Sequence, residues 1–267
     1  MSTAVICAAT IAPIQAEPSL RSEQVSQLLY GRVADVLAAQ GEWRRIKNRF
    51  DSYEGWVHLG YLREVEVNLA DEWERSATGW SEGAVAEIRD RLIRIPLGGR
   101  VQVDGTGGIV MPGGRKGKLL SGRVAPADVI AKEARAMPIE KWLVKFFAGA
   151  PYQWGGVTPW GVDCSGLVQV AFAARGVALP RESFLQADVG EPVTRETARS
   201  GDLLFFSENG RSITHVAVVG PGDTLIHSTL SAGGFLQEPW TDGTRAAYLQ
   251  NIFVNGRRLP RVDTAAL

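Results

Sequence analysis

The chain has few cysteines and histidines and no excess of charge of either sign. Its 267 residues include two cysteines, Cys7 and Cys164, and three histidines, His58, His215 and His227. Two cysteines do not form a disulfide framework, and they favour a reducing compartment. No Cys/His spacing typical of zinc occurs, so we expect neither a metal nor a cofactor. A formal net charge of zero gives no electrostatic reason to expect nucleic acid or a membrane surface as a partner.

The sequence also lacks an apolar run long enough to span a bilayer. The apolar N-terminal stretch Ala4–Ala9 has no Lys or Arg before Arg21, so the basic region of an export signal is missing. Pro13 interrupts the apolar stretch further. We therefore interpret the stretch as a strand in which Cys7 is packed, and we predict a cytoplasmic location.

The pattern of residues 1–66 predicts an all-β domain. Short apolar or alternating segments follow one another and end in glycine turns or polar turns, which is typical of a small barrel. The segments are Val5–Ala9, Ala12–Gln15, Gln27–Gly31, Arg32–Leu37, Trp43–Lys47 and Gly55–Leu59.

Residues 67–130 carry a less regular pattern. Glu82 to Arg91 has apolar residues three and four apart, which predicts a helix there. Glycine turns then separate three segments that predict strands, Arg94–Val103, Gly107–Met111 and Gly113–Leu120. We interpret residues 67–130 as a second, divergent small barrel.

Residues 131–267 predict an α+β domain with helices first and an antiparallel sheet after them. A helix is expected to start at Ala127 or Asp128 and to lead into this domain, and a second covers Ile139–Phe147. A short helix is expected around Gln186. The predicted strands are Gly201–Phe206, Ile213–Val219, Thr224–Ser228 and Asn251–Val254.

A glycine- and proline-rich loop precedes Cys164 and ends at Asp163, a residue type that often caps a helix N-terminus. Apolar residues recur at helical spacing from Leu167 onward, so Cys164 occupies the first position of a predicted helix. The positive end of a helix stabilises an anion, which predicts a lowered pKa for this thiol and a role as nucleophile. The alternative is that Cys164 is a small buried apolar residue.

A cysteine nucleophile needs a base, and the base needs a group that orients it. His215 and His227 fall on consecutive predicted strands joined by a short Gly-Pro-Gly-Asp turn. Such strands place residues side by side on one face. We predict His215 as the base and His227 as its orienting partner, whereas His58 has no evident partner and is interpreted as structural.

Five segments carry a family resemblance. They are Pro151-Tyr-x-Trp-Gly-Gly, Asp163-Cys-Ser-Gly-Leu-Val, Leu179-Pro-Arg, Gly201-Asp-Leu-Leu-Phe-Phe and Thr214-His-Val-Ala. These motifs resemble the NlpC-type family of papain-like cysteine peptidases. The N-terminal Tyr53-Glu-Gly-Trp-Val segment and those before it resemble a bacterial SH3-like domain. Together the chain resembles the bacterial γ-D-glutamyl-L-diamino-acid endopeptidases.

The resemblance implies a fold and a set of site residues. It implies a papain-like catalytic domain at residues 131–267, an SH3-like domain at 1–66 and a second at 67–130. It implies Cys164 as nucleophile, His215 as base and His227 as the third member, with Tyr152 stabilising the oxyanion. Four further residues are predicted to bind the substrate's free ammonium group or to close the cleft: Asp163, Ser165, Glu23 and Tyr53.

The implied substrate is a murein peptide with a free N-terminal L-Ala, cut between D-Glu and the diamino acid during recycling of cell-wall fragments. Two alternatives stay open at this point. One is an inactive wall-binding module whose SH3-like domains anchor it. The other is an amidase or acyltransferase that uses the same cysteine and histidine.

Overall fold

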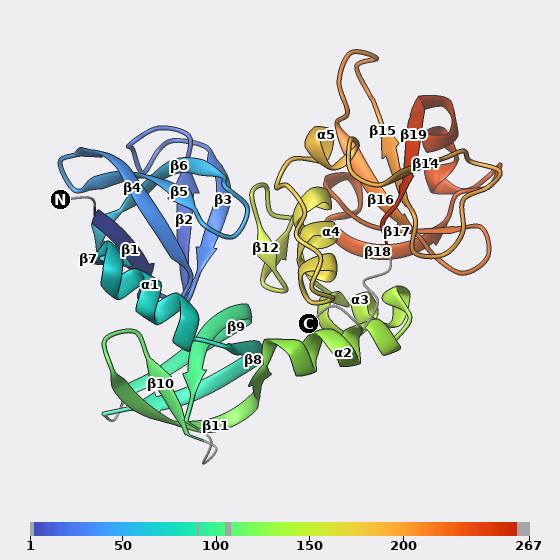
Figure 1. Cartoon of the computed structure of the whole chain (residues 1–267). Coiled ribbons are helices and arrows are strands. Elements are labelled where there is room, and N and C mark those ends of the chain that lie inside the picture. The colour runs from blue at the N-terminus through green and yellow to red at the C-terminus, as the bar shows by residue number, and fades with distance from the viewer. Residues whose placement is uncertain (1–2, 90, 105–107, 261–267) are drawn as a thin grey trace. The chain divides into compact units, whose positions relative to one another are not determined.

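The computed structural model describes residues 3–89, 91–104 and 108–260, and it contains two compact units, residues 1–130 and 131–267 (Figure 1). No helix in these described ranges is both long enough and apolar enough to cross a membrane.

The first unit begins with a seven-stranded antiparallel sheet in the order β3-β2-β6-β5-β4-β1-β7. Alternate residues of these strands point inward, so that Val5, Cys7, Ile14 and Leu28 are fully or almost fully buried in one core. This confirms the predicted all-β fold and the packed position of Cys7. The strands are β1 Thr3–Cys7, β2 Ile11–Gln15, β3 Gln24–Leu29, β4 Val33–Gln40, β5 Trp43–Asn48, β6 Glu54–His58 and β7 Leu62–Glu66, with a 3-10 turn at Leu59–Tyr61.

Helix α1, Val67–Ser76, follows the first sheet and was not predicted. Its buried residues Ala70 and Trp73 are three apart and pack beneath β1 and β4. The indole N–H of Trp73 donates a hydrogen bond of 2.7 Å to the carbonyl of Gly31. This helix therefore fixes the start of the second barrel to the first.

The second barrel is a closed four-stranded sheet in which β8 pairs with β9 and β11, and β10 pairs with β9 and β11. The helix predicted for Glu82–Arg91 is wrong, because strand β8 occupies most of that stretch. Ala84, Ala86 and Ile88 are buried at every second position, which is the period of a strand. The strands are β8 Gly79–Ile88, β9 Arg91–Val103, β10 Ile109–Met111 and β11 Arg115–Pro126.

Helix α2, Ala127–Ala136, begins where the sequence predicts it and leads into the second unit. There, a six-stranded antiparallel sheet in the order β14-β19-β15-β16-β17-β18 packs against helix α4, which contacts β16 and β17. The α+β prediction is confirmed. The helices are α3 Ile139–Phe147, α4 Cys164–Ala173 and α5 Ser183–Gln186; the strands are β12 Val157–Thr158, β13 Gly161–Val162, β14 Glu191–Val193, β15 Leu203–Phe206, β16 His215–Val219, β17 Thr224–Thr229, β18 Gly234–Pro239 and β19 Phe253–Arg258.

This sheet differs from the sequence prediction in several details. Strands β14 and β18 were not predicted; β14 pairs with β19, and β18 pairs with β17 along its whole length. The final strand starts at Phe253, because the residues before it form a 3-10 helix, Arg245–Ile252. A second short 3-10 turn, Leu230–Ala232, joins β17 to β18.

Candidate active site

Cys164 is the first residue of helix α4, as the sequence predicts. Asp163 caps this helix through its side chain, which accepts a hydrogen bond of 2.7 Å from the backbone N–H of Gly166. Nine consecutive residues of α4 are buried, so the helix lies inside the unit rather than on its surface. The nucleophile candidate is therefore held at the end of a buried helix, where backbone N–H groups have no partner within the helix.

The loop before the helix packs directly on its first turn. A Cβ atom at Gly166 would lie 2.2 Å from the carbonyl oxygen of Gly156, so only glycine fits there. The N–H of Asp163 donates to the same carbonyl at 3.3 Å. This close approach explains why the Asp-Cys-Ser-Gly motif ends in glycine despite the cost of glycine in a helix.

Asp163 and Arg181 form a buried, bidentate ion pair. It joins the N-terminus of α4 to the segment that follows this helix. The two residues are 5% and 2% exposed, and Arg181 Nη1 and Nη2 lie 3.1 Å and 2.5 Å from the two carboxylate oxygens. Burial alone would lower the pKa of Arg181, but the carboxylate of Asp163 outweighs burial and raises it. Arg181 also donates to the Ser165 hydroxyl at 2.8 Å, and the Gly155 N–H donates to Asp163 at 2.9 Å.

These contacts change the interpretation of Asp163 and Ser165. The Asp163 carboxylate accepts from two backbone N–H groups, the Arg181 guanidinium and the Ser165 hydroxyl. These donors occupy the lone pairs of the Asp163 carboxylate. A side chain that binds a substrate ammonium group needs a lone pair that is still free to accept a hydrogen bond. The geometry therefore favours a structural role for both residues, and substrate binding by them stays a prediction.

We expect Arg181→Met to lower the free energy of unfolding of the protein by about 3–5 kcal/mol, because it leaves the Asp163 carboxylate buried without its counter-charge. Chemical denaturation followed by circular dichroism measures this change. Arg211→Met is the matched control, since Arg211 is exposed and its replacement should change the free energy by less than about 0.5 kcal/mol. A loss below about 1 kcal/mol for Arg181→Met would contradict the assigned role.

The two histidines of the sheet are in direct contact. His215 Nε2 and His227 Nδ1 are 2.7 Å apart. Val218 pairs with Ile226, so the two histidines lie diagonally across β16 and β17 rather than directly opposite. The prediction that they are neighbours on one face is confirmed, while their roles in catalysis stay a prediction.

A carboxylate that sequence reasoning missed continues this chain of hydrogen bonds. His227, only 2% exposed, has its Nε2 2.9 Å from Glu238 Oε1 on β18. Arg245 Nε donates to Glu238 Oε2 at 2.9 Å and Nη2 donates to Oε1. Burial alone would raise the pKa of Glu238, but the hydrogen bonds from His227 and Arg245 outweigh burial and lower it. The Glu238 carboxylate is therefore ionised at neutral pH.

The ionised carboxylate fixes the tautomer of both imidazoles. A carboxylate only accepts hydrogen bonds, so His227 Nε2 carries the proton that Glu238 receives. When His227 carries only this one proton, its Nδ1 is an acceptor, and His215 donates to it through Nε2–H. We call the contacts from Glu238 through His227 to His215 the relay. The lone pair of His215 is therefore on Nδ1, which takes no part in the relay and is available to take a proton.

Cys164 begins helix α4, which packs against β16, the strand that His215 begins. Two nearby backbone N–H groups, those of Val216, which follows His215 on β16, and of Ser165, favour the thiolate of Cys164. The sequence prediction of a lowered pKa is wrong, because burial and then the neighbouring Asp163 carboxylate raise the pKa of Cys164 to about 12. Burial, followed by the neighbouring His227, lowers the pKa of His215 to about 3.

Both groups are therefore neutral near pH 7: the thiol is protonated because its pKa lies above that pH, and His215 is unprotonated because its pKa lies below it. Since only the thiolate reacts, we expect iodoacetamide to alkylate Cys164 more slowly at pH 7 than free cysteine. The rate should rise continuously from pH 6 to pH 9. Rates are measured by mass spectrometry, with Cys164→Ala reporting any reaction at Cys7. A rate that is high and constant from pH 5 to pH 8 would instead indicate a thiolate–imidazolium pair at rest.

Tyr152 borders the thiol. It lies in the loop before α4, where its N–H donates to the carbonyl of Gly233 at 2.9 Å, and it is half-buried. Burial, then the nearby Cys164 and Asp163, raise the pKa of Tyr152, so its hydroxyl keeps its proton at neutral pH. A neutral phenol beside the thiol can donate a hydrogen bond to an oxyanion formed there, and this role stays a prediction.

Glu23 and Tyr53 belong to the first unit, whereas Cys164 belongs to the second, so their predicted part in closing the cleft stays a prediction. Within the first unit they lie at the same end of the sheet. Gln15, at the end of β2, pairs with Gln24 and with Trp56, and Glu23 and Tyr53 directly precede β3 and β6. Glu23 is exposed and Tyr53 is half-buried.

One of the missed residues stands in a sequence motif, and the other does not. Arg181 stands in the Leu-Pro-Arg motif, but a lone arginine in a loop does not reveal its partner. Glu238 alternates with exposed Gln237 on a strand of ordinary composition, so only the pairing of β17 with β18 identifies it. Within the described residues, no group of three His, Cys, Asp or Glu side chains is arranged to hold a metal ion.

Two family models match this chain. Residues 149–255 match the NlpC/P60 family, and residues 14–62 match the bacterial dipeptidyl-peptidase SH3 domain. The first range contains the cysteine, both histidines and the carboxylate of the relay. The second covers most of the seven-stranded sheet of the first unit.

Curated relatives align with about a third of the chain. The γ-D-glutamyl-L-lysine dipeptidyl-peptidase of Bacillus subtilis is 42% identical over 85 residues, which are 31% of this chain and 29% of that protein. The probable endopeptidase NlpC of Escherichia coli is 39% identical over 87 residues, 32% of this chain and 56% of that protein. The chain thus covers less than two thirds of the length of these relatives.

Solved structures share the fold over nearly the whole chain. The crystal structure of an NlpC/P60 family protein from Bacillus cereus superposes with a TM-score of 0.80 at 20% identity, covering 96% of this chain and 100% of that one. An NlpC/P60 endopeptidase from Photobacterium damselae gives a TM-score of 0.71 at 16% identity, covering 94% of this chain and 70% of that one.

Proposed function

We propose that this chain, which carries an NlpC/P60 cysteine-peptidase domain behind a bacterial dipeptidyl-peptidase SH3 domain, hydrolyses the γ-D-glutamyl–diamino-acid bond of peptidoglycan-derived peptides. The observation that carries the proposal is the relay from Glu238 through His227 to His215, on a strand against which the helix of Cys164 packs. It supplies a nucleophile and a base in the correct tautomer. The matched relatives, whose names include a γ-D-glutamyl-L-lysine dipeptidyl-peptidase, support the bond and the substrate class.

The reaction starts with the neutral pair. As the substrate displaces water from the site, the Cys164 thiol transfers its proton to His215 Nδ1, and the thiolate attacks the γ-carbonyl carbon. The helix N-terminus and the Tyr152 hydroxyl stabilise the oxyanion that forms. The imidazolium then protonates the leaving amine of the diamino acid, which leaves a thioester on Cys164.

The second half of the reaction uses the same base. The diamino acid leaves, a water molecule enters, and His215 takes a proton from that water as its oxygen attacks the thioester carbon. Collapse of the second tetrahedral intermediate releases the γ-carboxylate and returns the proton to the Cys164 sulfur. His227 and Glu238 act as positioning residues, since they touch the base and not the substrate.

The proposal includes a requirement for a free N-terminal L-Ala, and with it a role in recycling cell-wall fragments rather than in cutting intact wall. Burial of an unpaired ammonium group is costly, so a site that accepts it must supply acceptors. Glu23 and Tyr53, at one end of the first sheet, are the residues proposed to supply them.

The experiment compares two peptides, L-Ala-γ-D-Glu-diaminopimelate and the same peptide acetylated at its N-terminus. Mass spectrometry of the products should show L-Ala-D-Glu and free diaminopimelate from the first, and cleavage of the second slower by about a hundredfold or more. Equal rates would refute the ammonium requirement but leave the peptidase assignment. Absence of cleavage in both, with a folded protein, would favour a binding module instead.

A further inference from the structure

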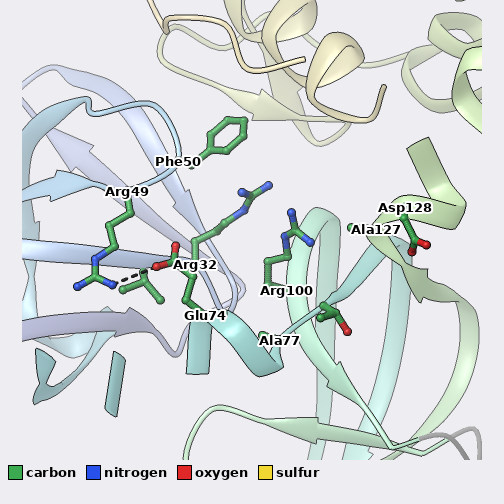
Figure 2. Close-up of a pocket in the computed structure, with 11 residues that line it drawn as sticks. Arg32, Arg49, Phe50, Glu74, Ala77, Arg100, Ala127 and Asp128 are labelled. Atoms are coloured by element: carbon green, nitrogen blue, oxygen red, sulfur yellow. Dashed lines mark hydrogen bonds and ion pairs between the residues drawn. The ribbon is translucent and has the colours of Figure 1, made fainter. Parts of the chain in front are cut away.

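The first unit contains a pocket that no part of the proposed reaction uses. It has a volume of about 560 Å³ and is lined wholly by residues between 31 and 128 (Figure 2). Arg32 and Phe50 come from the first sheet, Glu74 from α1 and Arg100 from β9. The figure shows the guanidinium groups of Arg32 and Arg100 turned toward each other in this pocket.

The backbone at this point is held rigidly. The N–H of Arg100 donates to the carbonyl of Tyr30 at 2.8 Å. Gly31 has a φ of +74°, and a Cβ atom there would lie 1.9 Å from the carbonyl oxygen of Arg100. The turn at Tyr30 and Gly31 therefore meets strand β9 without side chains between them, and this contact fixes where the side chains of Arg32 and Arg100 leave the backbone.

Aromatic rings hold the two guanidinium groups in place. The Arg32 group lies 4.3 Å from the ring centre of Phe50 and 5.2 Å from that of Trp80. The Arg100 group lies 5.0 Å from the Trp80 ring. Arg32 also donates through Nε to the carbonyl of Gly98 at 3.1 Å. Cation–π contacts and one hydrogen bond orient the planar groups and leave their remaining N–H donors available for another partner.

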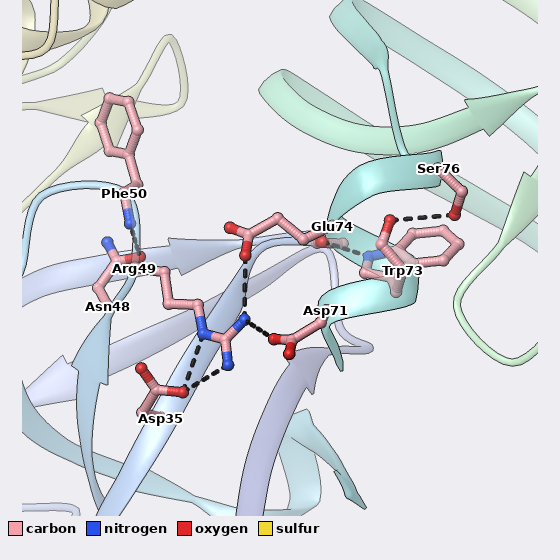
Figure 3. A network of polar contacts seen from close by, with 9 residues as sticks. Asp35, Asn48, Arg49, Phe50, Asp71, Trp73, Glu74 and Ser76 are labelled. Atoms are coloured by element: carbon pink, nitrogen blue, oxygen red, sulfur yellow. Dashed lines mark hydrogen bonds and ion pairs between the residues drawn. The ribbon is translucent and has the colours of Figure 1, made fainter. Parts of the chain in front are cut away.

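Most carboxylates near the pocket form ion pairs with a third arginine, Arg49. Arg49 binds Asp35, Asp71 and Glu74 at 2.7, 2.8 and 3.0 Å, as Figure 3 shows. By contrast, in the part of the chain that the structure describes, no carboxylate lies within ion-pair distance of Arg32 or Arg100. Burial and then the neighbouring Arg100 lower the pKa of Arg32 to about 9, while the charges of Asp51 and Glu74 oppose this shift. Burial also lowers the pKa of Arg100. A guanidinium group nevertheless keeps its proton at neutral pH.

We propose that Arg32 and Arg100 form a binding site for a small oxyanion, either a phosphate or a carboxylate group. Two half-buried like charges held side by side repel each other, and an anion between them removes that cost. Guanidinium groups match the oxygens of both anions through paired N–H donors. The pocket is large enough for a small molecule that carries such a group.

The experiment is isothermal titration calorimetry of the full chain with inorganic phosphate and, separately, with succinate, at an ionic strength kept constant with chloride. We expect saturable binding of at least one of them, and the pair of titrations identifies whether phosphate or carboxylate is preferred. Arg100→Gln should weaken that binding by about tenfold or more, and Arg100→Lys by less, because lysine keeps the charge but not the paired donors.

Arg94→Gln is the matched control, because Arg94 lies on the same strand but is exposed and outside the pocket. Its affinity should equal that of the wild type within about twofold. Failure of the wild-type chain to bind either anion saturably would overturn the proposal. So would unchanged affinity in an Arg100→Gln variant whose circular dichroism shows that it is folded. Neither result bears on the peptidase assignment, which depends on residues of the second unit.

Discussion

Replacing Cys164 with alanine should lower kcat/KM for L-Ala-γ-D-Glu-diaminopimelate by at least about a thousandfold. The reason is that the Cys164 sulfur forms the covalent bond to the acyl group on which the proposed reaction depends. The Cys164 side chain is small and 8% exposed, so the alanine variant should keep its fold. Product formation is measured by liquid chromatography with mass spectrometry.

Cys7→Ala is the matched control, since it removes the only other thiol of the chain. Cys7 is fully buried in the first sheet, where its Sγ lies 3.2 Å from the carbonyls of Ala9 and Leu28. Its replacement should cost some stability but leave kcat/KM within about twofold of the wild type. Equal loss of activity in both variants, or none in Cys164→Ala, would exclude Cys164 as the nucleophile.

Replacing Glu238 with glutamine should lower kcat by about a hundredfold to ten-thousandfold, although the side chains have nearly the same shape. An amide can donate a hydrogen bond as well as accept one. If it donates to His227 Nε2, the proton of His227 moves to Nδ1, which then donates to His215 Nε2. His215 then carries its proton on Nδ1 and cannot accept one from the thiol there.

The effect on kcat should exceed the effect on KM, because Glu238 touches the base and not the substrate. Glu191→Gln, an exposed residue on β14, is the control for the charge change and should keep wild-type activity. Ring-nitrogen NMR of His215 and His227 reports the tautomers directly. An active Glu238→Gln variant with unchanged tautomers would contradict the relay.

Local sequence signals predicted the positions of the candidate nucleophile and of the candidate base. A capping aspartate before an apolar helical repeat placed Cys164 at the first position of α4. Two histidines on strands joined by a tight turn were expected to meet, and His215 and His227 do so at 2.7 Å. Both inferences depend on residues close together in the chain, where helix and hairpin periodicity determine geometry.

The parts that failed depend on tertiary pairing or on burial. Glu238 becomes the partner of His227 only when β18 pairs with β17, and a strand that begins with glycine and ends with proline gives a weak signal. The stretch from Glu82 was misread as a helix because Val85 and Ile88 are three apart, whereas burial follows Ala84, Ala86 and Ile88. The pKa of Cys164 was predicted with the wrong sign, since burial outweighs the helix terminus.

Trapping the acyl-enzyme with hydroxylamine tests the central claim most directly. Hydroxylamine competes with water for a thioester, so wild-type protein turning over L-Ala-γ-D-Glu-diaminopimelate in its presence should release the γ-hydroxamate of L-Ala-D-Glu together with free diaminopimelate. Cys164→Ala should release neither. Release of diaminopimelate with no hydroxamate, even at high hydroxylamine concentration, would show direct attack by water and contradict nucleophilic catalysis by Cys164.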